Sequence, residues 1–397
     1  MANKDPMPVA GSTPPTKPWQ AVRRAMARQL LRGPLLQFWC HRKFLRVEKL
    51  CLHKTVEVSA APPPEPRTIP RKTGLPLRKI AFIADVMWEA NELLPELAKI
   101  GEVETLNLRP ALRKAAPENA AQVVARTVAE FITHWRGQPP DAVLLYARGG
   151  LLSEEVFALI RQRWACPLLG MNLDDKANFW PYGVFAGGDE DYRRWTGRFD
   201  LNITNSQIAS SWYQQQGAAC IYSPPGVHIP SGLTGPTSAN FKYPLSFLGS
   251  RKLDREIMVN RLRQAKLPIT VFGQGWPAAE WVSDPNAIFR ASQINLGLGL
   301  ATPNLATIKN RDFECPGVGA CYLTTYNWEL ANWWDIGKEI LCYRNAEELI
   351  EMLAWYRNRP EDCLKIAQAA WRRSINEHTW EKRFRKVFRA AGFQVNN

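Results

Sequence analysis

From residue 79 onward, short apolar segments alternate with longer amphipathic ones. Residues 79–85 (KIAFIAD) form an apolar run that ends in a carboxylate, and residues 141–147 (DAVLLYA) repeat the pattern after a helical stretch. Strands this apolar are buried on both faces, which is typical of parallel sheets covered by helices. The chain is therefore predicted to have an α/β fold.

The alternation occurs twice. A stretch rich in Pro, Gly, Ser and Thr, residues 224–238, separates the two runs, so we expect one domain at 77–230 and a second at 231–375. Each domain is predicted to be doubly wound and Rossmann-like, with a cleft between the two that the carboxyl ends of the strands face. The further predicted strands lie at residues 103–108, 167–174, 201–204 and 220–223, then at 245–249, 269–272, 320–324 and 339–343.

The net positive charge of the chain comes from its two ends. The net charge of +14 arises from 51 Lys and Arg against 37 Asp and Glu. Residues 1–76 hold 14 basic and 4 acidic side chains, residues 371–397 hold 7 and 2, and the segment between them is close to neutral. A nucleic-acid-binding protein carries its basic surface on a folded domain, so no nucleic-acid partner is expected.

Residues 1–76 are predicted to form a basic extension. Within residues 1–60, apolar and aromatic side chains recur at helical spacing beside Lys and Arg, a pattern that suits the surface of an anionic membrane. Helices packed on the protein or on a partner, or a transit peptide, would give a similar pattern. The proline-rich residues 61–70 are predicted to be a semi-rigid linker.

The cysteine content and the hydropathy predict where the chain works. Eight cysteines include no CxxC pair, which indicates reduced thiols and neither a zinc site nor a disulfide framework. No apolar run approaches the roughly 20 residues needed to cross a bilayer. We expect a cytoplasmic protein, held peripherally on the inner face of the plasma membrane if the extension binds there.

Glycines follow two predicted strands of the second domain. One strand end continues into Gly249, Ser250 and Arg251, with Arg255 in the next helix, and the other continues into Gly273 and Gly275. Glycine lets the backbone approach a ligand, and amides beside Arg suit a phosphate. An ordinary β-α turn has the same composition.

The second domain also carries the most specific motif. The run RDFECPGVGACYLTT begins at residue 311, and IGKEILCYRNAEELIEML follows it. FLGSRKLDR and VFGQGW precede it. Together these segments resemble the CgeB-like glycosyltransferases, which are GT-B enzymes related to the group 1 glycosyltransferases. The resemblance covers residues 79–388, is strongest after residue 245 and does not include the basic extension.

The resemblance implies a donor site for a nucleotide-sugar. Glu314 matches a family glutamate that binds the ribose hydroxyls, although a carboxylate there also stabilises a helix N-terminus. Gly317 and Gly319 would let the backbone approach the donor phosphates or would only form a turn. Arg311 would neutralise the diphosphate or pair with a carboxylate. The group 1 relatives carry a second glutamate eight positions earlier, where this chain has Ala306, so their retaining mechanism cannot be assumed.

Three carboxylates are candidates for a catalytic base in the first domain. Asp85, Asp174 and Asp175 follow predicted strands, where their side chains would reach the cleft and accept the proton of an attacking hydroxyl. Aspartates in these positions equally cap helices. His228 lies in the interdomain stretch, residues 224–238. It suits a structural role as well as it suits an acid, a base or a phosphate contact.

No metal site is expected. Asp189 and Asp191 form an Asp-x-Asp sequence, which holds a divalent metal in other glycosyltransferases, but here it follows no apolar strand and is predicted to be a solvated loop. No cofactor is expected besides the donor substrate.

The resemblance implies an enzyme that moves a sugar from a nucleotide-sugar to a hydroxyl of a glycan or lipid-linked acceptor, without a metal. It also implies that the C-terminal helix, residues 376–397, crosses back to the first domain. Two alternatives remain: a nucleotide-sugar hydrolase or epimerase on the same fold, and a non-enzymatic protein that binds anionic surfaces.

Overall fold

In the computed structural model, the described residues are 74–85, 90–116, 119–180, 191–237, 239–277, 279, 282–302 and 305–395. The predicted amphipathic helices of residues 1–60 and the linker at 61–70 lie outside them. Within the described part of the chain, no helix is both long enough and apolar enough to cross a membrane.

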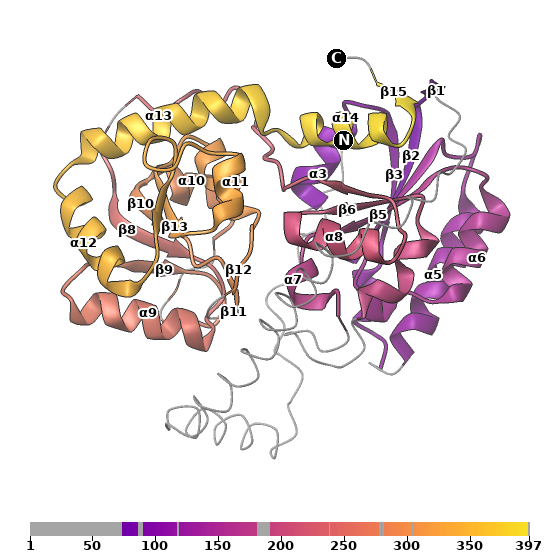
Figure 1. The fold of residues 1–397 in the computed structure, drawn as a ribbon, viewed down its shortest axis with the longest axis horizontal. Coiled ribbons are helices and arrows are strands. Elements are labelled where there is room, and N and C mark those ends of the chain that lie inside the picture. Colours follow the sequence, from indigo (N-terminus) through magenta and orange to yellow (C-terminus); the bar gives the residue numbers. More distant parts are fainter. Residues whose placement is uncertain are drawn as a thin grey trace, which may run out of the picture.

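The first domain is built on a six-stranded parallel sheet, drawn on the right of Figure 1. Alternate strand residues such as Phe82 and Ile83 are buried in separate hydrophobic clusters, because successive side chains point to opposite faces. Both faces are therefore covered, as the apolar strands predict. The strands, in spatial order, are β3 (Glu102–Asn107), β2 (Lys79–Ala84), β4 (Ala142–Tyr146), β5 (Leu168–Asn172), β6 (Leu201–Thr204) and β7 (Cys220–Tyr222).

Helices and short 3₁₀ segments connect these strands. Ser153 and Ser206 are the N-caps of two of the helices, and each side chain accepts a hydrogen bond from a backbone N–H of the first turn. The connecting helices are α3 (Ala90–Leu97), α4 (Arg109–Leu112), α5 (Ala120–His134), α6 (Glu154–Arg163), α7 (Asp175–Asn178) and α8 (Gln207–Gln215).

The second domain contains a five-stranded parallel sheet. Its strands, in spatial order, are β14 (Leu341–Tyr343), β13 (Tyr322–Thr325), β10 (Ser292–Leu296), β8 (Tyr243–Leu248) and β9 (Thr270–Phe272). The helices are α9 (Leu253–Gln264), α10 (Pro285–Arg290), α11 (Arg311–Gly317), α12 (Ala346–Tyr356) and α13 (Pro360–Glu377). A hairpin of β11 (Leu300–Thr302) and β12 (Leu305–Ala306) lies beyond the carboxyl end of β10.

The sequence pattern did not predict β10, the central strand of this sheet. Its sequence, SQINL, places polar residues at buried positions. Asn295 can be buried because its polar groups have partners. Its amide donates to the carbonyls of Phe289 and Cys321, and its oxygen accepts from Ser246 Oγ. Helix α10 and the β11–β12 hairpin were also not predicted.

The end of the chain returns to the first domain. Helix α14 (Trp380–Ala390) packs Trp380, Phe384 and Phe388 into the same hydrophobic cluster as the strands of the first sheet. Strand β15 (Phe393–Gln394) then pairs with β1 (Leu75–Pro76), and Figure 1 shows both beside the first sheet. The first domain is thus assembled from two segments that are far apart in the sequence.

Candidate functional site

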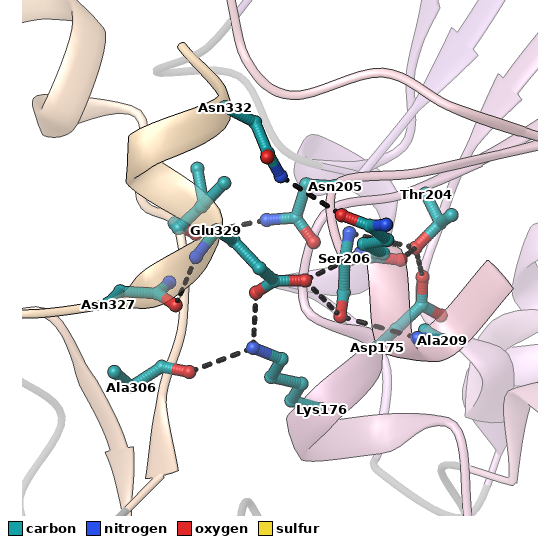
Figure 2. A network of polar contacts seen from close by, with 12 residues as sticks. Asp175, Lys176, Thr204, Asn205, Ser206, Ala209, Ala306, Asn327, Glu329 and Asn332 are labelled. Atoms are coloured by element: carbon teal, nitrogen blue, oxygen red, sulfur yellow. Dashed lines mark hydrogen bonds and ion pairs between the residues drawn. The ribbon is translucent and has the colours of Figure 1, made fainter. Parts of the chain in front are cut away.

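A buried polar network joins the two domains, as Figure 2 shows. Lys176 of α7 forms an ion pair with Glu329 of the 3₁₀ helix η4 (Trp328–Asn332), and both side chains are almost fully buried. Glu329 Oε1 also accepts from Gln207 N at 2.6 Å and from Ser206 Oγ at 3.2 Å, both at the start of α8. Lys176 Nζ donates to Ala306 O at 2.9 Å. Ala306, the position of the missing glutamate, therefore lies at the domain interface.

Two further contacts extend the interface. Asn205 Nδ2 donates to Ile308 O at 3.0 Å, and Lys309 Nζ donates to Asp174 Oδ1 at 2.8 Å. The loop before α11 is thereby fixed against the carboxyl ends of the first sheet's strands. Side chains of this loop and side chains at these strand ends therefore face each other across the domain interface.

A cavity of about 590 Å³ opens at that edge of the first sheet. This volume lies within the range of small-molecule sites in proteins. The cavity is at the carboxyl ends of β2, β4 and β5, where parallel α/β sheets bind ligands. Its lining residues are Asp85, Arg109, Leu112, Arg113, Tyr146, Ala147, Arg148, Asn172, Leu173, Asp174 and Asn178.

Asp85 is a buried carboxylate in the wall of this cavity, with only 4% of its surface exposed. Arg148 Nε donates to its Oδ2 at 2.8 Å, which fixes the orientation of the carboxylate. Its Oδ1 has no hydrogen-bond partner among the described residues. A buried oxygen without a partner is unfavourable unless a ligand supplies a donor, so Asp85 suits the binding of a hydroxyl.

Asp174 also lines the cavity, and 46% of its side chain is exposed. Its carboxylate is bound to Lys309 of the other domain. Asp174 therefore contributes to the contact between the domains at the mouth of the cavity.

Asp175 lies elsewhere. It is 1% exposed and accepts from Tyr213 Oη at 2.9 Å, from Asn172 Nδ2 at 2.6 Å and from Thr204 Oγ1. Burial raises its pKa to about 8. A neutral carboxyl enclosed in this way holds β5, β6 and α8 together and does not reach a substrate in this structure.

We expect Asp175→Asn to preserve stability at pH 7 and Asp175→Ala to lower the free energy of unfolding by about 3 kcal/mol, because only alanine leaves buried donors without acceptors. The unfolded carboxyl ionises near pH 4 and the folded one near pH 8, so wild-type stability should fall as the pH rises through this interval. The asparagine variant should lack that part of the pH dependence. Urea unfolding at pH 5, 7 and 9 measures both effects, and equal losses for the two variants at pH 7 would show a charged Asp175.

In the second domain, two glycine-containing loops meet at the end of β8. Gly273 has a φ of +107°, and a Cβ there would lie 2.8 Å from Gly249 O. The same carbonyl accepts from Trp276 Nε1 at 2.7 Å. Glycine is therefore required at residue 273 by both the backbone conformation and the close approach to residue 249.

Two arginines converge on this strand end. Arg255 of α9 donates through Nη1 to Ser250 O at 2.9 Å, and Arg311, the first residue of α11, donates through Nη1 to Leu248 O. Neither forms an ion pair among the described residues, and the Nε of each is buried without a hydrogen-bond partner. Burial and the charge of Arg311 lower the pKa of Arg255. Two neighbouring cations that form no ion pair among the described residues favour the binding of an anion.

The other glycines and Arg251 have contacts of their own. Arg251 forms an ion pair with Glu256 at 2.5 Å, and Gly275, at a φ of +87°, packs beside it. A Cβ at residue 317 would lie 2.6 Å from Val227 Cγ2. Gly319 has a φ of +75°, and a Cβ there would lie 2.6 Å from Pro236 Cδ. Residues 317 and 319 thus pack against the linker between the domains, which gives both glycines a structural role.

Glu314 is buried in α11 and faces the first domain. Its carboxyl forms a hydrogen bond with that of Glu92 in α3, and burial raises the pKa of Glu314. Two carboxyl groups form such a bond only when one of them holds a proton. In this structure Glu314 therefore contacts another acid, and ribose hydroxyls would replace that contact if they bind here.

In the described part of the chain, no group of three or more His, Cys, Asp or Glu side chains is placed to hold a metal ion. Asp191 is buried and forms ion pairs with Arg193 and Arg194, so the prediction of a solvated loop is wrong there. Asp189 lies outside the described residues. His228 Nδ1 is 2.9 Å from Glu96 Oε1, a contact between the linker and α3.

The cavity arginines were missed by sequence reasoning. Arg148 follows a predicted strand just as Asp85 does, so the rule that selected Asp85 would also have selected Arg148. Arg109 and Arg113 lie on a short helix turn without a recognisable motif.

One family model matches part of the chain. A family model described as glycosyl transferase-like matches residues 251–389, which include α9, α11 and all but the last residue of α14. No curated protein matches the chain. The match does not include the strands of the first sheet.

Solved structures match the fold of both domains. The Anabaena protein HepE, crystallised with UDP and glucose, is 14% identical with a TM-score of 0.54, and the match covers 79% of this chain and 99% of that one. Sucrose-phosphate synthase from Thermosynechococcus elongatus is 12% identical with a TM-score of 0.52, covering 79% and 100%. A Listeria monocytogenes protein described as a UDP-N-acetylglucosamine 2-epimerase is 14% identical with a TM-score of 0.50, covering 81% and 100%. The prediction of a GT-B fold with two Rossmann-like domains is confirmed.

Proposed function

We propose that this protein is a glycosyltransferase that moves a sugar from a nucleotide-sugar to a hydroxyl of an acceptor. The observation that carries the proposal is the pair Arg255 and Arg311, two cations at the carboxyl end of β8 that form no ion pair with any described carboxylate. The glycosyl transferase-like match includes both residues, and a GT-B neighbour binds UDP and glucose. We also propose that it belongs to the CgeB-like subgroup of these enzymes.

The donor diphosphate would lie against the two guanidinium groups. Their buried Nε atoms would donate to its oxygens, and the positive charge would stabilise the nucleoside diphosphate as it leaves with the electron pair of the bond to the sugar. Arginine supplies the charge that a divalent ion supplies in other transferases, so we propose that transfer does not need a metal. Glu314 would exchange its contact with Glu92 for the ribose hydroxyls.

The acceptor would occupy the cavity of the first domain. Asp85 Oδ1 would accept the proton of the acceptor hydroxyl while that oxygen forms its bond to the sugar carbon. Arg148 orients the carboxylate through Oδ2, and Oδ1 has no hydrogen-bond partner among the described residues. The protein's own residues thus account for the proton that is removed and for the charge that leaves.

The experiment is calorimetric titration of the full chain with UDP, GDP and dTDP, with and without EDTA. Arg255→Gln and Arg311→Gln should each weaken the best nucleotide by about 10- to 100-fold, because each removes charged hydrogen bonds to the diphosphate. EDTA should change nothing. The matched control is Arg263→Gln, an exposed arginine of the same helix α9 as Arg255.

Two results would contradict the proposal. Unchanged affinity in both arginine variants would show that the diphosphate binds elsewhere, and no binding of any nucleotide would remove the enzyme assignment. Release of nucleotide from a bound nucleotide-sugar without any acceptor would indicate a hydrolase on the same fold.

A further inference from the structure

The charges of the described residues that line the cavity in the first domain are not balanced. Five of the described residues that line it are charged, namely the carboxylates of Asp85 and Asp174 and the guanidinium groups of Arg109, Arg113 and Arg148. Each carboxylate already has a cation, since Asp85 pairs with Arg148 and Asp174 pairs with Lys309. Arg109 and Arg113 form no ion pair among the described residues. Among the described residues, the cavity therefore holds two positive charges that no carboxylate pairs with.

These two arginines lie on the same side of one helix turn. Arg113 N donates to Arg109 O at 2.9 Å, and residues four apart in a helix are neighbours on its surface. Helix α4 follows β3, so the turn stands at the same edge of the sheet as Asp85 at the end of β2. Both guanidinium groups can therefore act on one ligand while that ligand reaches Asp85.

We infer that the acceptor carries a phosphate monoester or diphosphate, which Arg109 and Arg113 bind while the reacting hydroxyl lies at Asp85. Two guanidinium groups present parallel N–H donors that match the oxygens of a phosphate. The cavity, at about 590 Å³, has room for a phosphate and for the group attached to it. This inference rests on the proposed function for the role of Asp85, but the anion site itself does not.

The site is separate from the donor site. Arg255 and Arg311 stand at the end of β8 in the second domain, whereas Arg109 and Arg113 belong to the first domain. Variants of the two pairs should therefore have different effects. Loss of Arg109 and Arg113 should lower the affinity for the acceptor phosphate and leave the affinity for the nucleotide unchanged.

The test is calorimetric titration of the full chain with glucose 1-phosphate and with octyl phosphate, beside methyl glucoside and octyl glucoside as uncharged probes. Both phosphates should bind, and the uncharged probes should bind about tenfold or more weakly. The double variant Arg109→Gln/Arg113→Gln should weaken both phosphates by about tenfold or more, with UDP affinity unchanged. The control Arg136→Gln/Arg163→Gln removes two exposed arginines of the same domain that do not line the cavity.

The outcomes separate the two proposals. Tighter binding of octyl phosphate indicates a lipid-linked source of the phosphate, and tighter binding of glucose 1-phosphate indicates a phosphorylated sugar. Equal affinity for charged and uncharged probes, or an equal loss in the control, overturns the anion site even if UDP binds. A loss of UDP affinity in the Arg109/Arg113 variant also overturns it, because the arginines would then belong to the donor. Phosphate binding that depends on both arginines, in a chain that binds no nucleotide, supports the anion site and overturns the transferase.

Discussion

Asp85→Asn is expected to lower kcat by a factor of about 10² to 10⁴, with little change in the KM of the nucleotide-sugar. Asparagine keeps an oxygen that can accept from Arg148 Nε, so the side chain should stay in place. It cannot take the proton of the acceptor hydroxyl. The measurement is the initial rate of nucleoside diphosphate release at saturating donor, in the presence of the acceptor that supports turnover.

Asp174→Asn is the matched control for this variant. It changes the second carboxylate of the same cavity, but this carboxylate is bound to Lys309 and half of it faces solvent. We expect less than a tenfold loss in kcat from it. An equal loss in both variants, or full activity of Asp85→Asn, would contradict Asp85 as the base. Urea unfolding of both variants shows whether the fold is retained.

Lys176→Met is expected to lower the free energy of unfolding by about 3 to 5 kcal/mol. The variant leaves the carboxylate of Glu329 buried at the domain interface with only the hydrogen bonds from Ser206 and Gln207. Removing one member of a buried ion pair costs more than the pair contributes, because the remaining charge is no longer compensated. Urea unfolding followed by tryptophan fluorescence measures the loss.

Two controls separate this effect from ordinary charge removal. The double variant Lys176→Met/Glu329→Gln should recover part of the loss, since it leaves no unpaired charge. Arg198→Met breaks the exposed pair with Glu154 and should cost less than about 1 kcal/mol. A loss below 1 kcal/mol for Lys176→Met, or no recovery in the double variant, would show that the charge of Glu329 is solvated in the folded protein.

The alternation of apolar strands and helices was enough to predict an α/β fold with parallel sheets, because central strands of the first sheet such as β2 and β4 are apolar and buried on both faces. The pattern failed at β10, where buried Ser292, Gln293 and Asn295 look like loop residues. Their burial depends on partners distant in the sequence, such as Ser246 for Asn295, and a local pattern carries no information about them.

The candidate site was predictable only where a strand end identifies it. Asp85 follows β2, and Arg255 and Arg311 lie beside recognisable motifs. Their sequence positions do not reveal that the guanidinium groups of Arg255 and Arg311 are neighbours, because this depends on how α9 and α11 pack against the same strand end. Arg109 and Arg113 indicate an anion site only once the structure shows that the cavity carboxylates are paired with other cations.

The return of α14 to the first domain has a consequence for synthesis of the chain. During translation, residues 77–230 emerge before the second domain, but their core lacks Trp380, Phe384 and Phe388 until α14 has left the ribosome. One apolar face of the nascent first sheet is exposed for the whole time that the second domain is being made. The first domain can therefore be completed only after the second has been made, although its synthesis begins earlier.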